Sequence, residues 1–369
     1  MQILKPTLIS IFSFFTLVVQ AQSLALGKKI NISNNDSFSG FEILDAQIDS
    51  HRLVISGEDH RYVNKNIAIE TKLLRYLIKK KGFKHLLIEQ GFSLGQMLNK
   101  YMITGDSILL KKIQNCSDES YYRFSKNLRT LNNSLADSQK FTIECIDVER
   151  FYDQPVSYMN YLLPKDKKIP EDLILDVEAL ISLEAYLNKE SNYDRYGNQK
   201  NDEYYNISVR KSIRHILRSY DSLNTSYKAY LGANFNEFDL VIKSISEKIY
   251  HETFNNMAQG IIYREQYMFK KFEGLANKYP NDRFFGQFGR CHATDTSISN
   301  DCDWYEVASF IKRVNQNSNF KTPCKAFAIG LTYPYRYNSK DKYYETSNDY
   351  TTKIKSYLNT AVSYTHLTL

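Results

Sequence analysis

The sequence predicts an α/β fold: a mainly parallel sheet flanked by helices, with a helical insertion or cap in the middle of the chain. Short apolar runs such as "RLVISG" and "KHLLIEQG" alternate with amphipathic helical patterns in the first and last parts of the chain. Strands joined through helices by short connections pair in parallel. Between residues 151 and 257 the pattern is helical, with no convincing strand. This combination favours one sheet built from two separate stretches of sequence.

The first α/β half, residues 22–150, contains three expected strands. "RLVISG" precedes an amphipathic helix that ends in "KKKG". The three lysines suit the negative end of the helix dipole, and Gly82 suits the left-handed position after the helix. The strand "KHLLIEQG" then precedes a helix over about Ser93 to Tyr101. A further helix, "YYRFSKNLRTLNNSL", leads into the strand "FTIECID".

The middle and the last part of the chain follow different patterns. Residues 151–257 contain three helical segments, "EDLILDVEALISLEAYL", "ISVRKSIRHILRSYDSL" and "FDLVIKSISEKIYHETF". Alternation resumes in residues 258–360, with a helix "IIYREQYMFKKFEGLANKY", a strand "RFFGQFG", a helix "WYEVASFIKRV" and a strand "KAFAIGLTY". We expect this second α/β half to complete the sheet of the first, with the helical insertion lying over it.

Both ends of the sequence carry expectations of their own. Residues 1–21 resemble a signal peptide, with Lys5, the apolar run "LISIFSFFTLVV" and small residues before a cleavage site after Ala21. The run is shorter than the about 20 residues of a membrane span. We therefore expect a periplasmic or secreted protein with no stable membrane span after cleavage. Residues 361–369 resemble a translated sequencing adapter and are expected to be a non-native tail; the alternative is an ordinary chain end.

Charge and cysteine content narrow the function classes. The net charge is +7, and basic residues are interspersed with acids, which indicates no nucleic-acid partner. The oligomeric state is not evident from sequence. Five cysteines in an exported chain leave at least one unpaired. Cys291 and Cys302 flank a polar loop and form the favoured disulfide, whereas Cys145 is expected to be a buried thiol.

Ionisable residues gather where the expected strands end, and in parallel sheets these ends share one edge. Glu58 and His60 lie two residues apart, so they share a face if the backbone stays extended, and Gly57 would let the chain turn there. Each residue has a structural alternative, such as helix capping by Glu58 or Asp59, but their convergence favours a site. The residues at this edge are Glu58, Asp59, His60, Glu89, Asp147, Glu149, Arg290, Cys291 and His292. A structural role is preferred for the remaining histidines of the fold, His51, His85, His215 and His251.

A family resemblance emerges from three segments. "VISGEDHRYVNKNIAIETKLLRYLIKKKGFKHLLIEQG", "NKYMITGD" and "REQYMFKKFEGLANKYPNDRFFGQFGRCHA" resemble, in this order, blocks of the erythromycin esterase-like superfamily. The resemblance covers the α/β portions and leaves the helical middle loosely matched. It implies hydrolysis of an ester or lactone, without a metal, by a histidine that activates water.

The resemblance also implies roles for particular residues. His60 would be the general base, Glu58 and Glu89 active-site carboxylates, His292 a second catalytic or substrate-contacting histidine, and Arg264 a substrate-binding arginine. Two departures from the family pattern stand out. Only Asp59 separates the glutamate from the histidine, where the family has two residues, and "GRCH" supplies only the last histidine of a longer family motif.

Three alternatives remain open, one of which is an inactive homologue retained as an interaction module. The Gly57-x-x-His60 motif is also similar to the Tiki/TraB-like and haem-binding lipoprotein-like branches, which implies a metal-dependent hydrolase or an exported haem- or metal-binding protein. His60, Glu89 and His292 would then be the ligands of a divalent metal, since imidazole and carboxylate suit such ions. The preferred prediction is an exported hydrolase without a cofactor, acting on a small-molecule ester or lactone.

Overall fold

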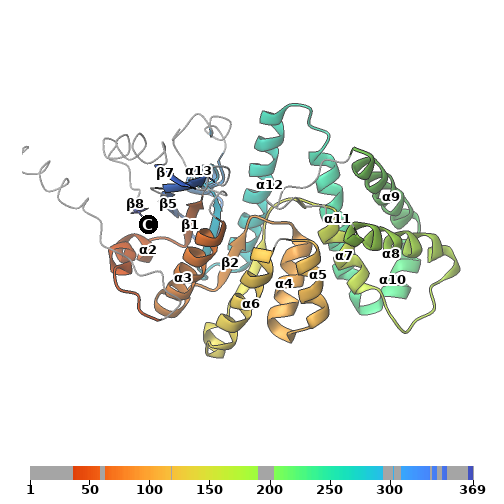
Figure 1. Cartoon of the computed structure of the whole chain (residues 1–369), viewed down its shortest axis with the longest axis horizontal. Coiled ribbons are helices and arrows are strands. Elements are labelled where there is room, and N and C mark those ends of the chain that lie inside the picture. Colours follow the sequence, from red (N-terminus) through yellow and green to blue (C-terminus); the bar gives the residue numbers. More distant parts are fainter. Residues whose placement is uncertain are drawn as a thin grey trace, which may run out of the picture.

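The computed structural model describes residues 36–368 except 59–62, 118, 190–202, 294–301, 303–308, 333–334, 339–342 and 347–364. The expected signal peptide, Asp59 and His60 lie outside the described residues. Figure 1 shows an elongated molecule with the sheet toward one end and the helices α8, α9 and α10 at the other. Within the described part, no helix has both the length and the apolar character of a membrane span.

The sheet is parallel throughout, which confirms the predicted fold class. Its strand order is β3-β2-β4-β1-β5-β8, and each neighbouring pair runs in the same direction. β1 and β4 therefore lie at the centre, and both are buried along nearly their whole length, as expected for a sheet covered on two faces. The strands are β1 (Leu53–Glu58), β2 (His85–Ile88), β3 (Thr142–Cys145), β4 (Phe284–Gly289), β5 (Ala326–Thr332) and β8 (Thr365–Thr368).

Helices cover both faces of the sheet, and the alternation of side chains along the strands assigns each helix to a face. Val54 and Phe285 belong to a core cluster shared with α3, α4 and α6. Their sequence neighbours Ile55 and Phe284 belong to a second cluster with α12 and α13. Successive side chains of a strand point to opposite faces, so one face is covered by α3, α4 and α6, and the other by α12 and α13. The helices are α2 (Asp45–Asp49), α3 (Val63–Lys81), α4 (Phe92–Thr104), α5 (Ser107–Asn115), α6 (Glu119–Asn133), α7 (Asp153–Leu162), α8 (Ile174–Lys189), α9 (Glu203–Ser222), α10 (Asn224–Leu231), α11 (Phe235–His251), α12 (Met257–Lys278) and α13 (Phe310–Gln316).

Several elements were not predicted from the sequence or differ in extent. α5, α7 and α10 are additional helices, and an antiparallel hairpin of β6 (Tyr335–Asn338) and β7 (Tyr343–Thr346) follows β5. The helix expected to end at Tyr101 continues to Thr104, and the strand "FTIECID" ends at Cys145. The middle of the chain is helical as expected, since no strand lies between β3 and β4 among the described residues. The expectation that this part lies over the sheet was wrong, because α8, α9 and α10 lie at the other end of the molecule (Figure 1). Short 3-10 turns occur at Phe41–Leu44, Asp137–Gln139, Glu171–Leu173 and Gly232–Asn234.

Two glycines near the carboxyl edge of the sheet serve close packing. Gly57 lies inside β1 and not at a turn, which corrects the role predicted for it. A Cβ at Gly57 would lie 3.0 Å from the Ala293 Cβ and 3.3 Å from the Arg290 Cα, so glycine lets the segment after β4 approach β1. A Cβ at Gly91 would overlap the side chain and backbone of Glu149. Gly82 has φ 69° after α3, which confirms the predicted helix end.

Replacing Gly91 with alanine should destabilise the fold. The added methyl group would lie 2.7 Å from the Glu149 Cα, so the backbone must shift, and such overpacking costs about 1–3 kcal/mol. Gly274→Ala is the matched control, because nothing lies within 4 Å of a Cβ there and alanine favours a helix interior by about 1 kcal/mol. Urea unfolding should show a loss of stability in the first variant and a gain in the second. Equal stability of the two variants would contradict this packing.

Candidate active site

The site lies at the carboxyl edge of the sheet, where the parallel strands deliver their following residues to one place. Glu89 follows β2, Asp147 follows β3 and His292 follows β4. Arg264 and Glu265 reach the same edge from α12, on the face of the sheet that this helix covers. These five side chains form a continuous network of ion pairs and hydrogen bonds, hereafter the ionic network.

Arg264 is the centre of the ionic network. Its Nε donates to Asp147 at 2.8 Å and 3.0 Å, and its Nη2 bonds both Asp147 and Glu89. The exposed fractions of the three side chains are 12% for Arg264, 11% for Glu89 and 0% for Asp147. Burial alone would raise the carboxyl pKa values. The positive charges of His292 and Arg264 instead hold the pKa of Glu89 well below its usual range, and Arg264 lowers the pKa of Asp147.

His292 lies between two carboxylates. Its Nδ1 pairs with Glu265, which is fully buried, and its Nε2 lies 3.3 Å from Glu89 Oε1. Burial would lower the pKa of this imidazole, but Glu265 and Glu89 together raise it to about 9. The ring is therefore an imidazolium at neutral pH, with both nitrogens as donors. His292 Nε2 also lies 3.4 Å from Arg264 Nη1. Both nitrogens are then donors, and both residues pair with Glu89.

Glu89 is held by several further groups. The backbone N–H of Gly289, in β4, donates to its Oε2 at 2.8 Å. Arg150 Nη1 lies 3.5 Å from its Oε1 and 3.6 Å from Asp147. With Arg150 included, three cations face three carboxylates, because Arg264, His292 and Arg150 balance Glu89, Asp147 and Glu265. A buried cluster of this size is tolerable because its charges are paired and hydrogen-bonded.

Glu58 lies on the other side of β4 from Glu89, since β4 separates β1 from β2. Its carboxylate accepts a 2.7 Å hydrogen bond from Gln287 Nε2. The Gln287 side chain is itself fixed, because it accepts from Ser56 and donates to the Asn66 carbonyl. Glu58 is therefore oriented at the end of β1. The predicted pairing of Glu58 with His60 falls on residues 59–62, so it stays a prediction.

Other residues predicted at this edge have different environments. Glu149 is buried away from the ionic network and accepts hydrogen bonds from Ser93 and Ser244, which joins α4 to α11. Burial raises its pKa. Cys291 forms the favoured disulfide with Cys302, so it carries no free thiol. Cys145 is unpaired, as expected, but it is half-buried and not buried.

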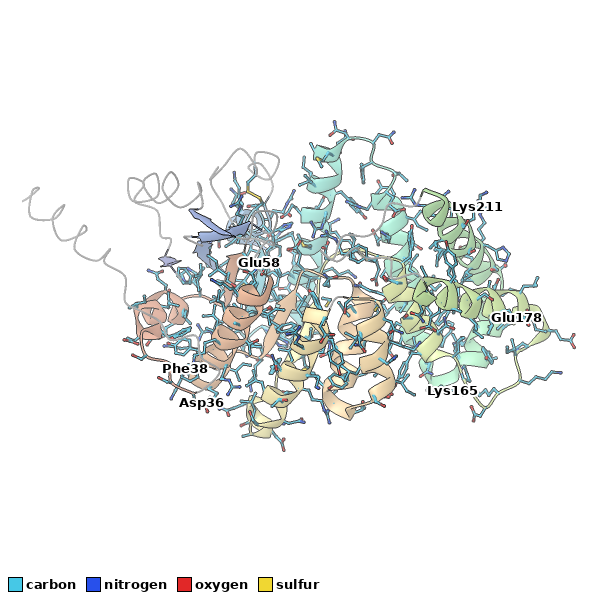
Figure 2. All side chains as sticks on the ribbon, viewed as in Figure 1. Asp36, Phe38, Glu58, Lys165, Glu178 and Lys211 are labelled. Atoms are coloured by element: carbon cyan, nitrogen blue, oxygen red, sulfur yellow. A yellow bond between two sulfur atoms is a disulfide. The ribbon has the colours of Figure 1, made fainter. Side chains whose placement is uncertain are left out.

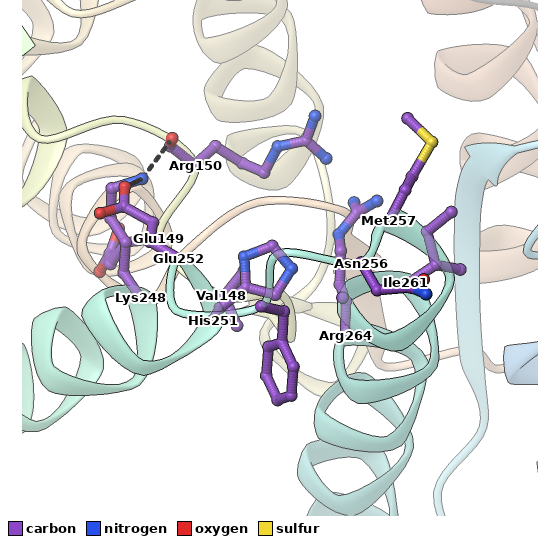
Figure 3. Close-up of a pocket in the computed structure, with 12 residues that line it drawn as sticks. Val148, Glu149, Arg150, Lys248, His251, Glu252, Asn256, Met257, Ile261 and Arg264 are labelled. Atoms are coloured by element: carbon purple, nitrogen blue, oxygen red, sulfur yellow. Dashed lines mark hydrogen bonds and ion pairs between the residues drawn. The ribbon is translucent and has the colours of Figure 1, made fainter.

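A pocket of about 400 Å³ adjoins the ionic network. Arg264 is part of its wall, and Figure 3 shows Arg150, His251 and Asn256 around the same space. The pocket lies between the end of α11, the start of α12 and the segment after β3, and its volume is in the range of small-molecule sites. Its lining residues are Val148, Glu149, Arg150, Lys248, His251, Glu252, Phe254, Asn256, Met257, Gly260, Ile261 and Arg264.

The other histidines were expected to be structural, and one of them, His251, lies in the wall of the pocket. His251 lines the pocket, because the last turn of α11 faces the start of α12. His85 lies at the opposite edge of the sheet, where it bonds Thr142 and Asp282. His51 bonds the Gln47 carbonyl, and His215 pairs with Asp176 at 3.3 Å.

Sequence reasoning did not identify Glu265, Gln287 or Arg150 as members of the site. Glu265 had a usable signal, because it directly follows Arg264 in the "REQYM" segment. Gln287 also had one, as a polar residue inside the apolar strand "RFFGQFG". Arg150 had none, since its role depends on how the segment after β3 turns over the edge.

Part of the alternative metal-ligand set lies outside the described residues. Among the described residues, no group of three or more histidines, cysteines and carboxylates is arranged to hold a metal ion. The ligand set considered above includes His60, which lies outside them. Glu89 and His292, the other two members of that set, are engaged with Arg264 and Glu265.

The imidazolium state of His292 can be measured directly. We expect its pKa, measured by NMR titration of the histidine rings, to be near 9, and Glu265→Gln to lower it because a neutral amide stabilises the charged ring less. His85 pairs with Asp282 at the opposite edge of the sheet, so its pKa, which burial lowers, should be the same in both proteins. A His292 pKa that does not change in the variant would rule out this pairing.

Comparison with known proteins places the fold. No family model and no curated protein sequence matches the chain. Three solved structures are similar over most of it. A succinoglycan biosynthesis protein has a TM-score of 0.54 at 16% identity, covering 87% of this chain and 75% of that one. A Bacillus cereus protein has a TM-score of 0.54 at 14% identity, covering 89% and 78%.

The third similar structure is a mutant of erythromycin esterase EreC in its open conformation. It has a TM-score of 0.51 at 13% identity and covers 84% of this chain and 77% of that chain. Identities this low establish a shared architecture and not a shared activity. The resemblance drawn from the motifs is thus confirmed at the level of fold: the chain shares its architecture with erythromycin esterase EreC.

Proposed function

We propose that this protein is an exported hydrolase that cleaves an ester or lactone with a histidine-activated water. The observation that carries the proposal is the ionic network: a buried imidazolium, His292, is held by Glu265 and Glu89 beside a pocket at the carboxyl edge of the sheet. The fold shared with EreC supports the reaction class. Export rests on the signal-peptide pattern of residues 1–21.

In this mechanism His60 is the general base, a role that rests on the family resemblance. Neutral His60 takes a proton from water as the water oxygen attacks the carbonyl carbon, and the carbonyl oxygen becomes an oxyanion. Glu58, oriented by Gln287, stands two residues before His60 and would stabilise the imidazolium that forms. Collapse of the tetrahedral intermediate breaks the C–O bond to the alkoxide. The alkoxide takes the proton from the His60 imidazolium, which gives an alcohol and a carboxylic acid.

His292 and Arg264 would stabilise the charge that develops on oxygen. A positively charged donor in a buried site stabilises an oxyanion more than it would in water. The structure refines the earlier assignment of Arg264 as a substrate-binding residue. Its Nε and Nη2 are engaged by Asp147 and Glu89, so its main role is to fix the carboxylate that holds His292. Glu89 and Glu265 are positioning residues for that ring.

The proposal is tested with a panel of esters and lactones and the full-length mature protein. His60→Ala and His292→Asn should each reduce kcat by about 100-fold or more, because general acid–base groups contribute about 10²–10⁴-fold. His215→Gln is the control, since His215 is 60% exposed and pairs outside the site; its kcat should equal that of the unmodified protein. Normal turnover by His60→Ala, or no turnover of any panel member by the unmodified protein, would refute the proposal.

The pH dependence of the reaction should report His292. If the imidazolium form is required, kcat falls as pH rises through the pKa of His292, which is about 9. Glu265→Gln removes a carboxylate that raises this pKa, so the alkaline limb of the profile should move to lower pH. A variant with reduced kcat but an unmoved alkaline limb would assign Glu265 a role in folding only.

A further inference from the structure

We propose that the pocket beside the ionic network binds a carboxylate group on an otherwise apolar small molecule, and that Arg150 is the residue that recognises it. The proposal deepens the proposed function, on which it rests for the identity of the ligand as substrate or product. The pocket is lined by charged side chains, and these differ in whether they already have close partners.

The lining contains three cations and two carboxyl groups. Arg150, Lys248 and Arg264 are the cations, and Glu149 and Glu252 are the acids. Two of the cations, Arg150 and Arg264, also face Glu89 and Asp147 behind the wall. What a ligand can meet therefore depends on which of these cations still has donors to offer.

Most of these charged groups have close partners. Lys248 Nζ lies 3.0 Å from both the Arg150 carbonyl and the Glu252 carboxylate. Glu252 also pairs with Arg210 at 3.2 Å and accepts from Tyr152 at 2.8 Å. Arg264 is engaged through its Nε and Nη2 by Asp147 and Glu89. None of these groups can turn to a ligand without breaking a buried pair.

Arg150 is different. Its guanidinium contacts carboxylates only at 3.5 Å and 3.6 Å, both through Nη1, and both acids are bonded more closely to Arg264. Among the described residues, no hydrogen bond engages its Nε or Nη2, and the side chain is 39% exposed. Figure 3 shows it extending across the pocket from the side of Lys248 and Glu252 toward Met257. A guanidinium with two unused donors can form the bidentate pair that carboxylates prefer.

The rest of the lining contains a histidine and apolar side chains. His251 lies in the wall, and its pKa is lowered first by burial and then by the charge of Arg264, with Asp147 acting in the opposite sense. The remaining wall, from Val148, Phe254, Met257 and Ile261, suits an apolar body attached to the carboxylate.

Phenylacetate and phenylacetamide are matched probes, because they share the aromatic body and differ in charge. Binding is followed by NMR through the ring signals of His251, with the full-length mature protein. We expect phenylacetate to bind at least tenfold more tightly than phenylacetamide. Arg150→Gln should weaken phenylacetate binding at least tenfold and leave phenylacetamide unchanged, and Arg150→Lys should retain part of the preference.

Lys165→Gln is the control for an equal change of charge. Lys165 is exposed in the loop after α7, and Figure 2 shows it at the margin of the helical part of the molecule. It should bind both probes as the unmodified protein does. Equal affinity for the two probes, a preference that survives in Arg150→Gln, or no shift of His251 on adding phenylacetate would overturn the proposal. Because binding is measured without turnover, a failure of the hydrolase proposal and a failure of the carboxylate site are distinguishable.

Discussion

The shared arginine at the carboxyl edge is the interaction on which the site depends. Arg264 holds Asp147 and Glu89 together, and both acids would repel each other without it. Removing one partner from a buried pair costs about 3–5 kcal/mol, because the remaining charge is left without compensation. Glu89 can face His292 only because its own charge is fixed by Arg264 and by the Gly289 N–H. Glu265 and Glu89 raise the pKa of His292, and Arg264 contributes by holding Glu89 in place.

The topology explains how distant segments supply this network. Parallel strands point their carboxyl ends to one edge, which gathers Glu89, Asp147 and His292 from segments up to two hundred positions apart. α12 contributes two successive residues to the network, Arg264 at its centre and Glu265 at one end. The same helix forms one wall of the pocket. A displacement of α12 would therefore change the charges and the pocket together.

Much of this arrangement follows from residue patterns, and the remainder depends on packing. The strands β1, β2, β4 and β5 were predicted because buried parallel strands read as short apolar runs. Glu89 and His292 were placed at this edge because each comes after the end of an expected strand.

Contacts across the fold were beyond such reasoning. Nothing in the spacing shows that Glu265 lies on the side of α12 that meets His292, or that Arg150 turns back over Glu89. Gly57 was assigned to a turn because glycine serves both turns and close approaches, and only coordinates separate the two. His251 was assigned to a helix face without knowledge that α12 would lie opposite it.

The central proposal is that His60 and His292, from distant segments of the chain, lie at one site with Glu89 between them. A crystal structure that resolves residues 59–62 tests it most directly. The account predicts that the His60 ring points to the same side of the carboxyl edge as His292, close enough for one water molecule to contact both the ring and Glu58. A His60 ring directed into solvent on the opposite flank of the sheet, with the Arg264 network intact, would contradict it.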